Sequence, residues 1–122
     1  MTGVQTCALP IFNRFHGHGS LRYVYARGQA IRSSQLTMKY IANPRRRHGR
    51  FSVVISKKVL KSAVKRNRVR RRIYEIIRLE LPHVRGGFDV VIMVFSPEVL
   101  LMSHDNLRTA VKQLFSQAGL YK

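Results

Sequence analysis

Residues 56–81 read SKKVLKSAVKRNRVRRRIYEIIRLEL, a strongly basic segment that runs directly into an amphipathic one. Nine of the sixteen residues from Lys57 to Arg72 are Lys or Arg, and none is acidic. Like charges three or four residues apart on a helix repel each other by about 0.2–0.5 kcal/mol per pair. Exposed helical faces therefore usually mix both signs, and a run of cations without anions indicates a surface that binds a polyanion.

The apolar residues of this segment recur at helical spacing. At about 100° per residue, Val69, Ile76 and Ile77 lie within about 60° of Ile73, which defines one buried stripe. We therefore predict a helix over residues 62–81 that packs along this stripe.

Arg66 does not fit this pattern, because it projects onto the buried stripe, where an unpaired cation is costly. Either the helix shifts phase before Arg66, or Arg66 lies beyond the edge of the core. Arg68, Arg71 and Arg72 point away from the stripe, toward solvent or a ligand.

Two predicted strands flank the helix. Residues 50–56 are rich in β-branched side chains, and residues 88–95 are almost continuously apolar, which is typical of a strand buried on both faces. The order strand, helix, strand predicts a crossover that places the helix on one face of a sheet. The general rule makes such a crossover right-handed.

A short helix and a further strand are predicted before the basic segment. Ser20 and Gly28 have the residue types of an N-cap and a stop for a helix over residues 21–27. In the second half of residues 31–43 the side chains alternate, which predicts a half-buried strand. We expect this strand to form a hairpin with residues 50–56 through the Pro- and Gly-containing turn 43–49.

The chain is predicted to end in a third helix. Ser103 or Asp105 can cap it, and Gly119 can end it. The expected buried stripe consists of Leu107, Ala110, Val111, Leu114 and Ala118.

Composition limits the possible functions. The 122 residues carry a formal charge of +18, and all five acidic residues follow Arg72. The longest apolar run, Val90–Phe95, is far below the roughly 20 residues needed to span a bilayer. Nucleic acid is therefore the expected polyanion, and not a membrane surface. No catalytic motif is evident, and we expect no catalytic residue in the protein.

No metal site is expected in the protein. Cys7 is the only cysteine, so the chain has neither an intramolecular disulfide nor a cysteine-based metal site. His16 and His18 could chelate a metal, but no further ligand lies at helical spacing. Residues 1–11 resemble a translated sequencing-adapter fragment, and we expect a non-native or disordered segment over residues 1–12.

The basic residues are chemically suited to RNA. Arg meets phosphate oxygens with two parallel hydrogen bonds and stacks on bases, and Asn67 can both donate to and accept from a ribose hydroxyl or a base edge. Leu21 and Tyr25 lie one helical turn apart, beside cationic residues. This spacing fits the stacking of unpaired bases and fits packing against the sheet equally well.

One part of the sequence resembles a known family. Ser56-Lys57-Lys58 at a strand end, followed by Ala63-Val64-Lys65-Arg66-Asn67-Arg68-Val69-Arg70-Arg71 at the start of a helix, resembles the signature of the bacterial ribonuclease P protein component. The Arg-Asn-Arg core with basic residues two and three positions further on is specific to that family. The resemblance covers about residues 20–122, including a first helix at 23–28, a buried strand at 89–92 and a last helix with its tail at 107–121.

The resemblance implies a single α/β domain over residues 13–122. Its fold would be a two-layer α+β sandwich with a mixed sheet and a left-handed β-α-β crossover, similar to the second domain of a small-subunit ribosomal protein.

The implied function is that of the protein subunit of ribonuclease P. It would bind the catalytic RNA and the 5′ leader of precursor tRNA and assist the endonucleolytic removal of that leader. The RNA subunit and its Mg²⁺ ions would perform the hydrolysis. The implied location is the bacterial cytoplasm, with no membrane and no obligate protein partner.

The resemblance also assigns site residues. The RNA contacts fall on Lys57, Lys58, Arg66, Asn67, Arg68, Arg70 and Arg71, and we add Lys61 and Lys65 from the same basic segment. The leader cleft, between the first helix and the sheet, would be lined by Leu21, Tyr25 and Lys39. Leu21 stands where the family usually has Phe, and Lys39 where it often has an aromatic residue.

Two alternatives use the same charge differently. A non-catalytic ribosomal or rRNA-binding protein would fit the charge alone equally well, and the Arg-Asn-Arg signature favours ribonuclease P over it. A DNA-binding protein is disfavoured because no second helix lies at helix-turn-helix spacing.

Overall fold

The computed structural model describes residues 18–33, 35–42 and 50–121, and their side chains from residue 23 onward. The expected non-native or disordered segment 1–12, the side chains of His16 and His18 and the turn 43–49 lie outside this part of the chain.

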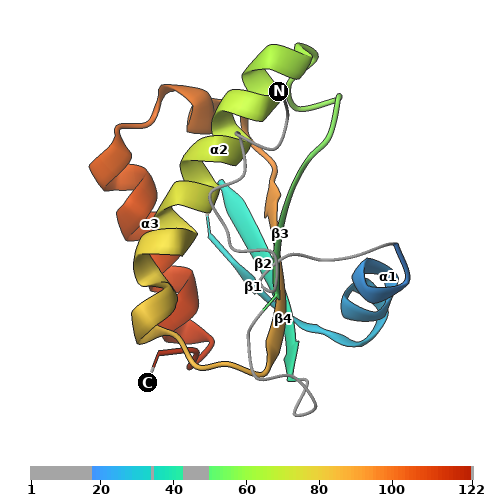
Figure 1. The fold of residues 1–122 in the computed structure, drawn as a ribbon. Coiled ribbons are helices and arrows are strands. Elements are labelled where there is room, and N and C mark those ends of the chain that lie inside the picture. The colour runs from blue at the N-terminus through green and yellow to red at the C-terminus, as the bar shows by residue number, and fades with distance from the viewer. Residues whose placement is uncertain (1–17, 34, 43–49, 122) are drawn as a thin grey trace, which may run out of the picture.

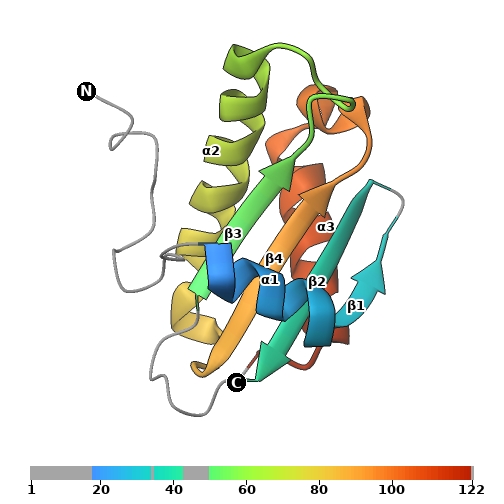
Figure 2. The ribbon, with the colours of Figure 1, turned by 90° about the vertical axis from the view of Figure 1, so that its right-hand side faces the viewer.

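A four-stranded sheet with helices on both faces forms the described part of the chain (Figures 1 and 2). Helices α2 and α3 pack against each other on one face, and α1 crosses the other. The predicted α+β fold with a mixed sheet is confirmed. The elements in chain order are α1 (His18–Arg27), β1 (Gln29–Arg32), β2 (Leu36–Ala42), β3 (Arg50–Ile55), α2 (Ala63–Glu80), η3 (Leu81–His83), β4 (Phe88–Val94), η4 (Pro97–Leu101) and α3 (His104–Gln117).

Strand β4 lies inside the sheet, whose order is β1-β2-β4-β3. It pairs antiparallel with β2 and parallel with β3. The predicted hairpin between the strands at 31–43 and 50–56 is therefore wrong, because β4 lies between them. The physical reason is burial: Val90, Val91 and Ile92 are fully buried, and an interior strand covered on both faces provides that environment.

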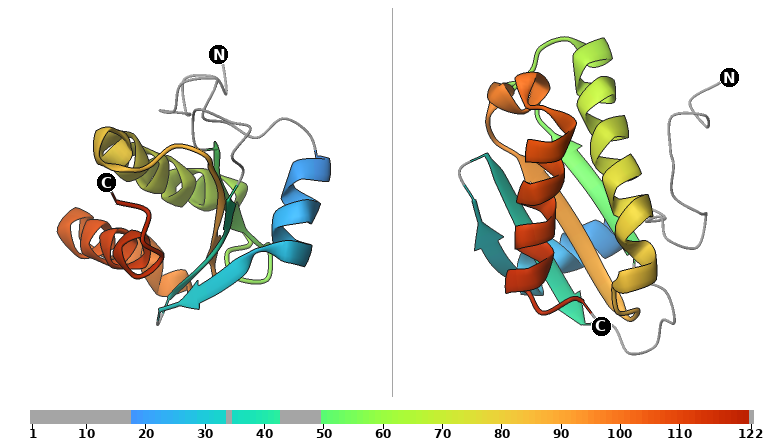
Figure 3. Two further views of the ribbon diagram at one scale, coloured as in Figure 1. Left: turned by 90° about the horizontal axis from the view of Figure 1, so that it is seen from below. Right: turned by 90° about the vertical axis from the view of Figure 1, so that its left-hand side faces the viewer.

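The connection from β3 through α2 to β4 is left-handed. In the right-hand panel of Figure 3 the helices are nearer the viewer than the sheet, and the chain passes from β3 on the right to the parallel β4 on the left. The general rule predicts the opposite hand. The family resemblance, and not the rule, predicted the hand correctly.

Helix α2 begins and ends close to its predicted limits. The Ser62 hydroxyl accepts a hydrogen bond from the Lys65 amide at 3.3 Å and so caps the helix. The α-helix gives way to the short 3₁₀ helix η3, in which Pro82 cannot continue the α-helical hydrogen bonding. The predicted stripe is fully buried: Val69, Ile73, Ile76 and Ile77.

The N-terminal elements differ from the prediction in two ways. Helix α1 begins at His18, so Ser20 lies within it and is not its N-cap. Strand β1 was not predicted, because its four residues are mostly exposed and show no apolar alternation. It forms an antiparallel hairpin with β2.

Gly28 ends α1 for a steric reason. A Cβ atom at this position would lie 2.5 Å from the Val24 carbonyl oxygen and 3.1 Å from the Tyr40 carbonyl oxygen. The Gly28 amide donates to the Val24 carbonyl at 2.7 Å, and Val24 itself is fully buried. Glycine therefore allows the end of α1 to lie directly against β2.

Helix α3 is capped by Ser103, whose hydroxyl accepts from the Asn106 amide at 3.1 Å. Its buried face includes Phe115, which the predicted stripe omitted and whose ring centroid lies 6.0 Å from that of Phe51. Gly119 follows the helix with a φ of 71°, the left-handed conformation typical of a helix stop. None of the described helices is both long and apolar enough to span a lipid bilayer.

A buried carboxylate joins the ends of α2 and α3. Glu80 is 3% exposed and accepts hydrogen bonds from the Tyr121 hydroxyl at 2.9 Å and from Arg108 Nη2 at 3.1 Å. Burial alone would raise the pKa of Glu80, but the two hydrogen bonds and the nearby cations Lys112 and Arg108 outweigh it, and the pKa is lowered. The carboxylate thus remains charged and holds the C-terminal residues against α2.

We predict that Gly28→Ala destabilises the protein by about 1–3 kcal/mol, the usual cost of forcing an atom into a packed site. The added methyl group must displace either the end of α1 or strand β2, since both nearest atoms belong to the backbone. Thermal unfolding followed by circular dichroism measures the effect. An unchanged melting temperature would contradict the steric role of this residue.

We predict that Tyr121→Phe lowers the free energy of unfolding by about 1–2 kcal/mol at pH 7, because it removes a hydrogen bond to a charged group. Since folding lowers the pKa of Glu80, the carboxylate stabilises the fold above its unfolded pKa of about 4.3 and stops doing so as the pH falls through the folded value. The difference in the free energy of unfolding between wild type and variant should therefore be smaller at pH 3 than at pH 7. Urea unfolding at both pH values tests this, and an equal difference at both would refute it.

Candidate nucleic-acid interface

Six exposed cations form a surface that we call the cationic end. They come from the connection between β3 and α2 and from the outward side of the first turns of α2, at one end of the sheet (Figure 1). None of them forms a hydrogen bond or ion pair with the described residues, so their charges are available to a ligand. They are Lys57, Lys58, Lys61, Lys65, Arg68 and Arg71.

The Arg66 side chain is bound to the backbone just before α2. Its Nη1 donates to the carbonyl oxygens of Leu60 at 2.8 Å and Lys61 at 2.9 Å. The first buried residue of α2 is Val69, so Arg66 lies beyond the edge of the core, the second of the two explanations considered above. It closes the turn that leads into α2, and its remaining N–H groups can still reach a ligand.

Asn67 and Arg70 lie along the outer edge of the sheet. Arg70 Nη1 donates to Asn67 Oδ1 at 2.8 Å, and Arg70 Nε donates to the Val53 carbonyl at 3.4 Å. The Val53 amide in turn donates to the Tyr74 hydroxyl at 3.2 Å. Both backbone groups of Val53 on edge strand β3 are therefore hydrogen-bonded to side chains of α2, which blocks further strand pairing there.

Arg72 belongs to the basic segment but not to the cationic end. Its guanidinium donates to the carbonyl oxygens of Val99, Leu100 and Met102 and so fastens η4 to α2. These carbonyls lie 27 or more residues away in the chain. No local sequence pattern indicates that this arginine has a structural role.

Tyr25 and Lys39 meet on the face of the sheet that carries α1. Lys39 Nζ donates to the Tyr25 carbonyl oxygen at 3.2 Å and lies 5.5 Å from the centroid of the Tyr25 ring. Burial raises the pKa of the Tyr25 hydroxyl, which therefore stays protonated. The structure brings together two of the three predicted cleft residues. The third, Leu21, lies in α1, and its side chain is outside the described part.

The face around this pair offers polar and apolar groups. Thr37 of β2 and Val91 of β4 are buried there, and Val54 of β3 is half-buried. Figure 2 shows α1 crossing only the lower part of this face, while the strands extend beyond it toward the cationic end. An extended ligand that follows the strands could therefore contact both Tyr25 and the cationic end.

A buried ion pair lies near the far end of the same face. Arg50 Nε and Nη2 donate to the two carboxylate oxygens of Asp89 at 3.0 and 2.8 Å, and both residues are almost fully buried. They are direct neighbours on the parallel strands β3 and β4. Sequence reasoning missed the pair, because it depends on a strand pairing that was not predicted.

The described residues contain no group of three or more His, Cys, Asp or Glu side chains that could hold a metal ion. The groups that this part of the chain presents to a ligand are cationic side chains, aromatic rings and hydrogen-bonding groups.

Comparison with known proteins identifies the same family as the signature. A family model described as ribonuclease P matches residues 9–119. The ribonuclease P protein component of Synechocystis is 38% identical over 97 residues, which cover 80% of this chain and 77% of that protein. The one from Clostridium kluyveri is 36% identical over 111 residues, which cover 89% and 96%.

Solved structures show the same fold. A Staphylococcus aureus RNase P protein superposes with a TM-score of 0.80 at 19% identity, covering 90% of this chain and 98% of that one. The RNase P protein from Thermotoga maritima gives 0.76 at 18% identity, covering 85% and 96%. None of these comparisons supports the alternative of a ribosomal protein. The match over most of its length shows that this chain belongs to the ribonuclease P protein family.

Proposed function

We propose that this chain is the accessory subunit of a ribonuclease P in which the RNA performs the chemistry. The observation that carries the proposal is the cationic end: six unpaired cations with no acidic residue among them, on a member of this family. Such a surface binds phosphates by releasing their counterions, without a requirement for particular bases. It suits a structured RNA partner, ribonuclease P RNA.

The cations of the basic segment would bind RNA in two different ways. Arg66 and Arg70 are held by backbone carbonyl oxygens, so their positions are set before RNA arrives. Little side-chain entropy is then lost on binding. The free lysines and Arg68 and Arg71 contribute charge that follows the RNA surface.

The 5′ leader of precursor tRNA is the second proposed ligand, bound beside α1. Tyr25 is 37% exposed and offers an aromatic face for an unpaired base. Lys39 holds a positive charge 5.5 Å from that ring, where a phosphate of the same nucleotide would lie. Lys39 in place of an aromatic residue shifts recognition at this position from base stacking toward the backbone.

Catalytic Mg²⁺ ions would be bound mainly through the RNA subunit and the substrate phosphates, since phosphate oxygens and water are the ligands that Mg²⁺ prefers. The protein would lower the repulsion between the two RNAs and so reduce the Mg²⁺ concentration that the holoenzyme needs. A protein that acts on precursor tRNA would work in the bacterial cytoplasm, and its proposed partner is RNA with no obligate protein.

We predict that the protein enhances cleavage of precursor tRNA by a bacterial ribonuclease P RNA at low Mg²⁺. The expected result is a cleavage rate at least tenfold above that of the RNA alone, with a difference that diminishes as Mg²⁺ is raised. Single-turnover cleavage of 5′-labelled precursor measures it. Absence of enhancement at every Mg²⁺ concentration would refute the proposed function.

We predict that the double variant Arg68→Gln/Arg71→Gln flattens the salt dependence of RNA binding. Each lost phosphate contact should reduce the slope of log K against log salt by about 0.7–0.9, so two contacts reduce it by about 1.4–1.8. The matched control is Arg32→Gln/Arg85→Gln, which removes the same charge from exposed arginines elsewhere whose side chains bond to none of the described residues.

Filter binding or fluorescence anisotropy over a salt series gives both slopes. Equal slopes for the two double variants would show that the cationic end is not the contact surface.

A further inference from the structure

Asn67 lies between Arg66 and Arg68 near the start of α2, and its amide is held in one orientation. Its Oδ1 accepts a hydrogen bond from Arg70 Nη1 at 2.8 Å. A guanidinium carries N–H donors and no acceptor, so the amide must turn its oxygen, and not its NH₂ group, toward Arg70. The NH₂ group forms no hydrogen bond with the described residues, and Asn67 is exposed. The amide therefore presents its N–H donors to a ligand.

Arg70 is itself fixed by the edge strand β3. Its Nε donates to the Val53 carbonyl oxygen at 3.4 Å, so the guanidinium joins β3 to Asn67. The Val53 amide donates to the Tyr74 hydroxyl at 3.2 Å. Asn67, Arg70 and Tyr74 stand at positions i, i+3 and i+7, which share one face of a helix, and α2 lies beside β3 (Figure 2). The orientation of the Asn67 amide thus depends on a strand 17 residues before Arg70 in the chain.

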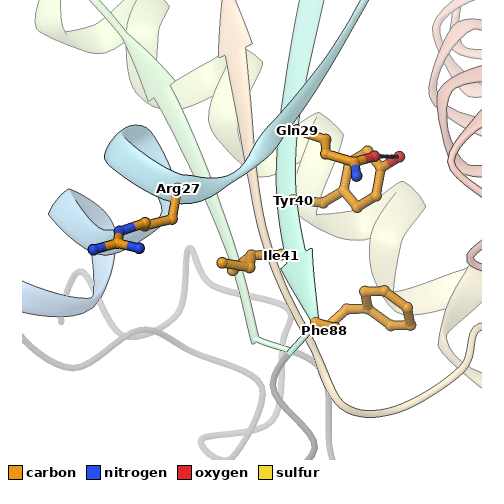
Figure 4. Close-up of a pocket in the computed structure, with 6 residues that line it drawn as sticks. Arg27, Gln29, Tyr40, Ile41 and Phe88 are labelled. Carbon is orange, nitrogen blue, oxygen red and sulfur yellow. Dashed lines mark hydrogen bonds between the residues drawn. The ribbon is translucent and has the colours of Figure 1, made fainter.

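A second exposed amide is held in the same manner but in different surroundings. Gln29 Oε1 accepts a hydrogen bond from the Tyr40 hydroxyl at 2.9 Å, beside a pocket of about 300 Å³ (Figure 4). Arg27 is the one cation among the six residues that line this pocket, and Figure 4 shows it on the opposite side of β2 from Gln29. Asn67, by contrast, has an arginine on each side in the sequence. Of these two amides, the one at Asn67 is therefore accompanied by cations that attract a phosphate.

The contacts of Arg70 also limit what it can offer to RNA directly. It is half-buried, and its Nε and Nη1 already donate within the protein. Arg68 is exposed, and its side chain bonds to none of the described residues. Arginine binds a phosphate most strongly through two parallel hydrogen bonds from a free guanidinium. Arg68 meets that requirement better than Arg70, whereas Arg70 is the residue in contact with the Asn67 amide.

We propose that Arg70 is a positioning residue, which holds the Asn67 amide so that its NH₂ group donates to an oxygen of the ribonuclease P RNA backbone. Arg68 would neutralise a neighbouring phosphate. An amide that is already fixed loses little side-chain entropy on binding, and a donor in a fixed position selects an RNA that places an acceptor opposite it. The inference rests on the proposed function and narrows the role of Arg70 within it, from a direct contact to a residue that acts through Asn67.

Two substitutions of Arg70 test the inference, in the whole chain and with a bacterial ribonuclease P RNA as the probe. Arg70→Gln removes the charge but keeps an NH₂ group that can donate to the Asn67 oxygen, since Gln and Asn side chains pair at this helical spacing. Arg70→Met removes both. We expect Arg70→Met to bind the RNA about five- to tenfold more weakly, the effect of one lost hydrogen bond to a charged group, and Arg70→Gln to stay within about twofold of the wild type. Equal losses for the two variants would overturn the inference.

A double-mutant cycle separates positioning from a general loss of structure. In an Asn67→Ala background, Arg70→Met should weaken binding by less than about twofold, because the amide that it orients is absent. A salt series gives a second readout: Arg70→Met should change the slope by less than half of the roughly 0.7–0.9 expected for Arg68→Met. An undiminished loss in the Asn67→Ala background, or a slope change equal to that of Arg68→Met, would show that Arg70 does not act through Asn67.

The matched controls come from the same helix and from the other held amide. Arg78 donates to Glu75 at the same spacing of three residues on α2, and both Arg78→Met and Gln29→Ala should bind the RNA as the wild type does. Cleavage enhancement by the wild-type protein is measured with the same preparations. Its absence would refute the proposed function, whereas enhancement together with equal losses for the two Arg70 variants would refute the positioning role alone.

Discussion

The structure depends on the burial of β4. Its apolar residues require neighbours on both edges and cover on both faces, and each further element supplies one of these. Strands β2 and β3 pair with the two edges of β4, α2 and α3 cover one face of the sheet, and α1 covers part of the other. Burying each large apolar side chain contributes about 1.5–3 kcal/mol. That gain is what keeps a chain of charge +18 compact.

Three arginines of the basic segment form hydrogen bonds that stabilise the fold itself. Arg66, Arg70 and Arg72 each direct their guanidinium to backbone carbonyl oxygens: at the turn before α2, on edge strand β3 and in η4. Carbonyl dipoles offset charge that no carboxylate is present to neutralise. This arrangement reduces the repulsion between neighbouring cations, and the outward cations of the segment keep charges that pair with none of the described residues.

Most local features of the fold could be predicted, although the start of α1 and strand β1 were not, and the strand order could not. The stripe Val69–Ile77, the cap Ser103 and the buried strand at 88–95 follow from periodicity and residue type over a few positions. The position of β4 between β2 and β3 depends on pairing across about fifty residues, which periodicity does not encode. The left hand of the crossover into β4 was predicted correctly only from the family resemblance.

The same distinction holds for the site. The sequence predicted the basic residues as one group, and it could not distinguish Arg68, which has no partner among the described residues, from Arg70 and Arg72, which are bound to backbone carbonyls. That difference depends on carbonyl groups of Val53 and Val99, far away in the chain. The pairing of Lys39 with Tyr25 likewise depends on how closely α1 approaches β2, which Gly28 determines.

The interior position of β4 also affects the order in which the protein can fold. During synthesis β1, β2 and β3 are complete more than thirty residues before β4, and β3 has no other strand partner in the described sheet. Until residues 88–94 emerge, β2 and β3 expose unpaired edges, and the first 72 residues of the chain contain eighteen Lys or Arg and no acidic residue. Non-local pairing of this kind slows folding and lengthens the exposure of strand edges. Mutual charge repulsion opposes aggregation of such a cationic chain, and the last strand to be synthesised is the one that completes the sheet.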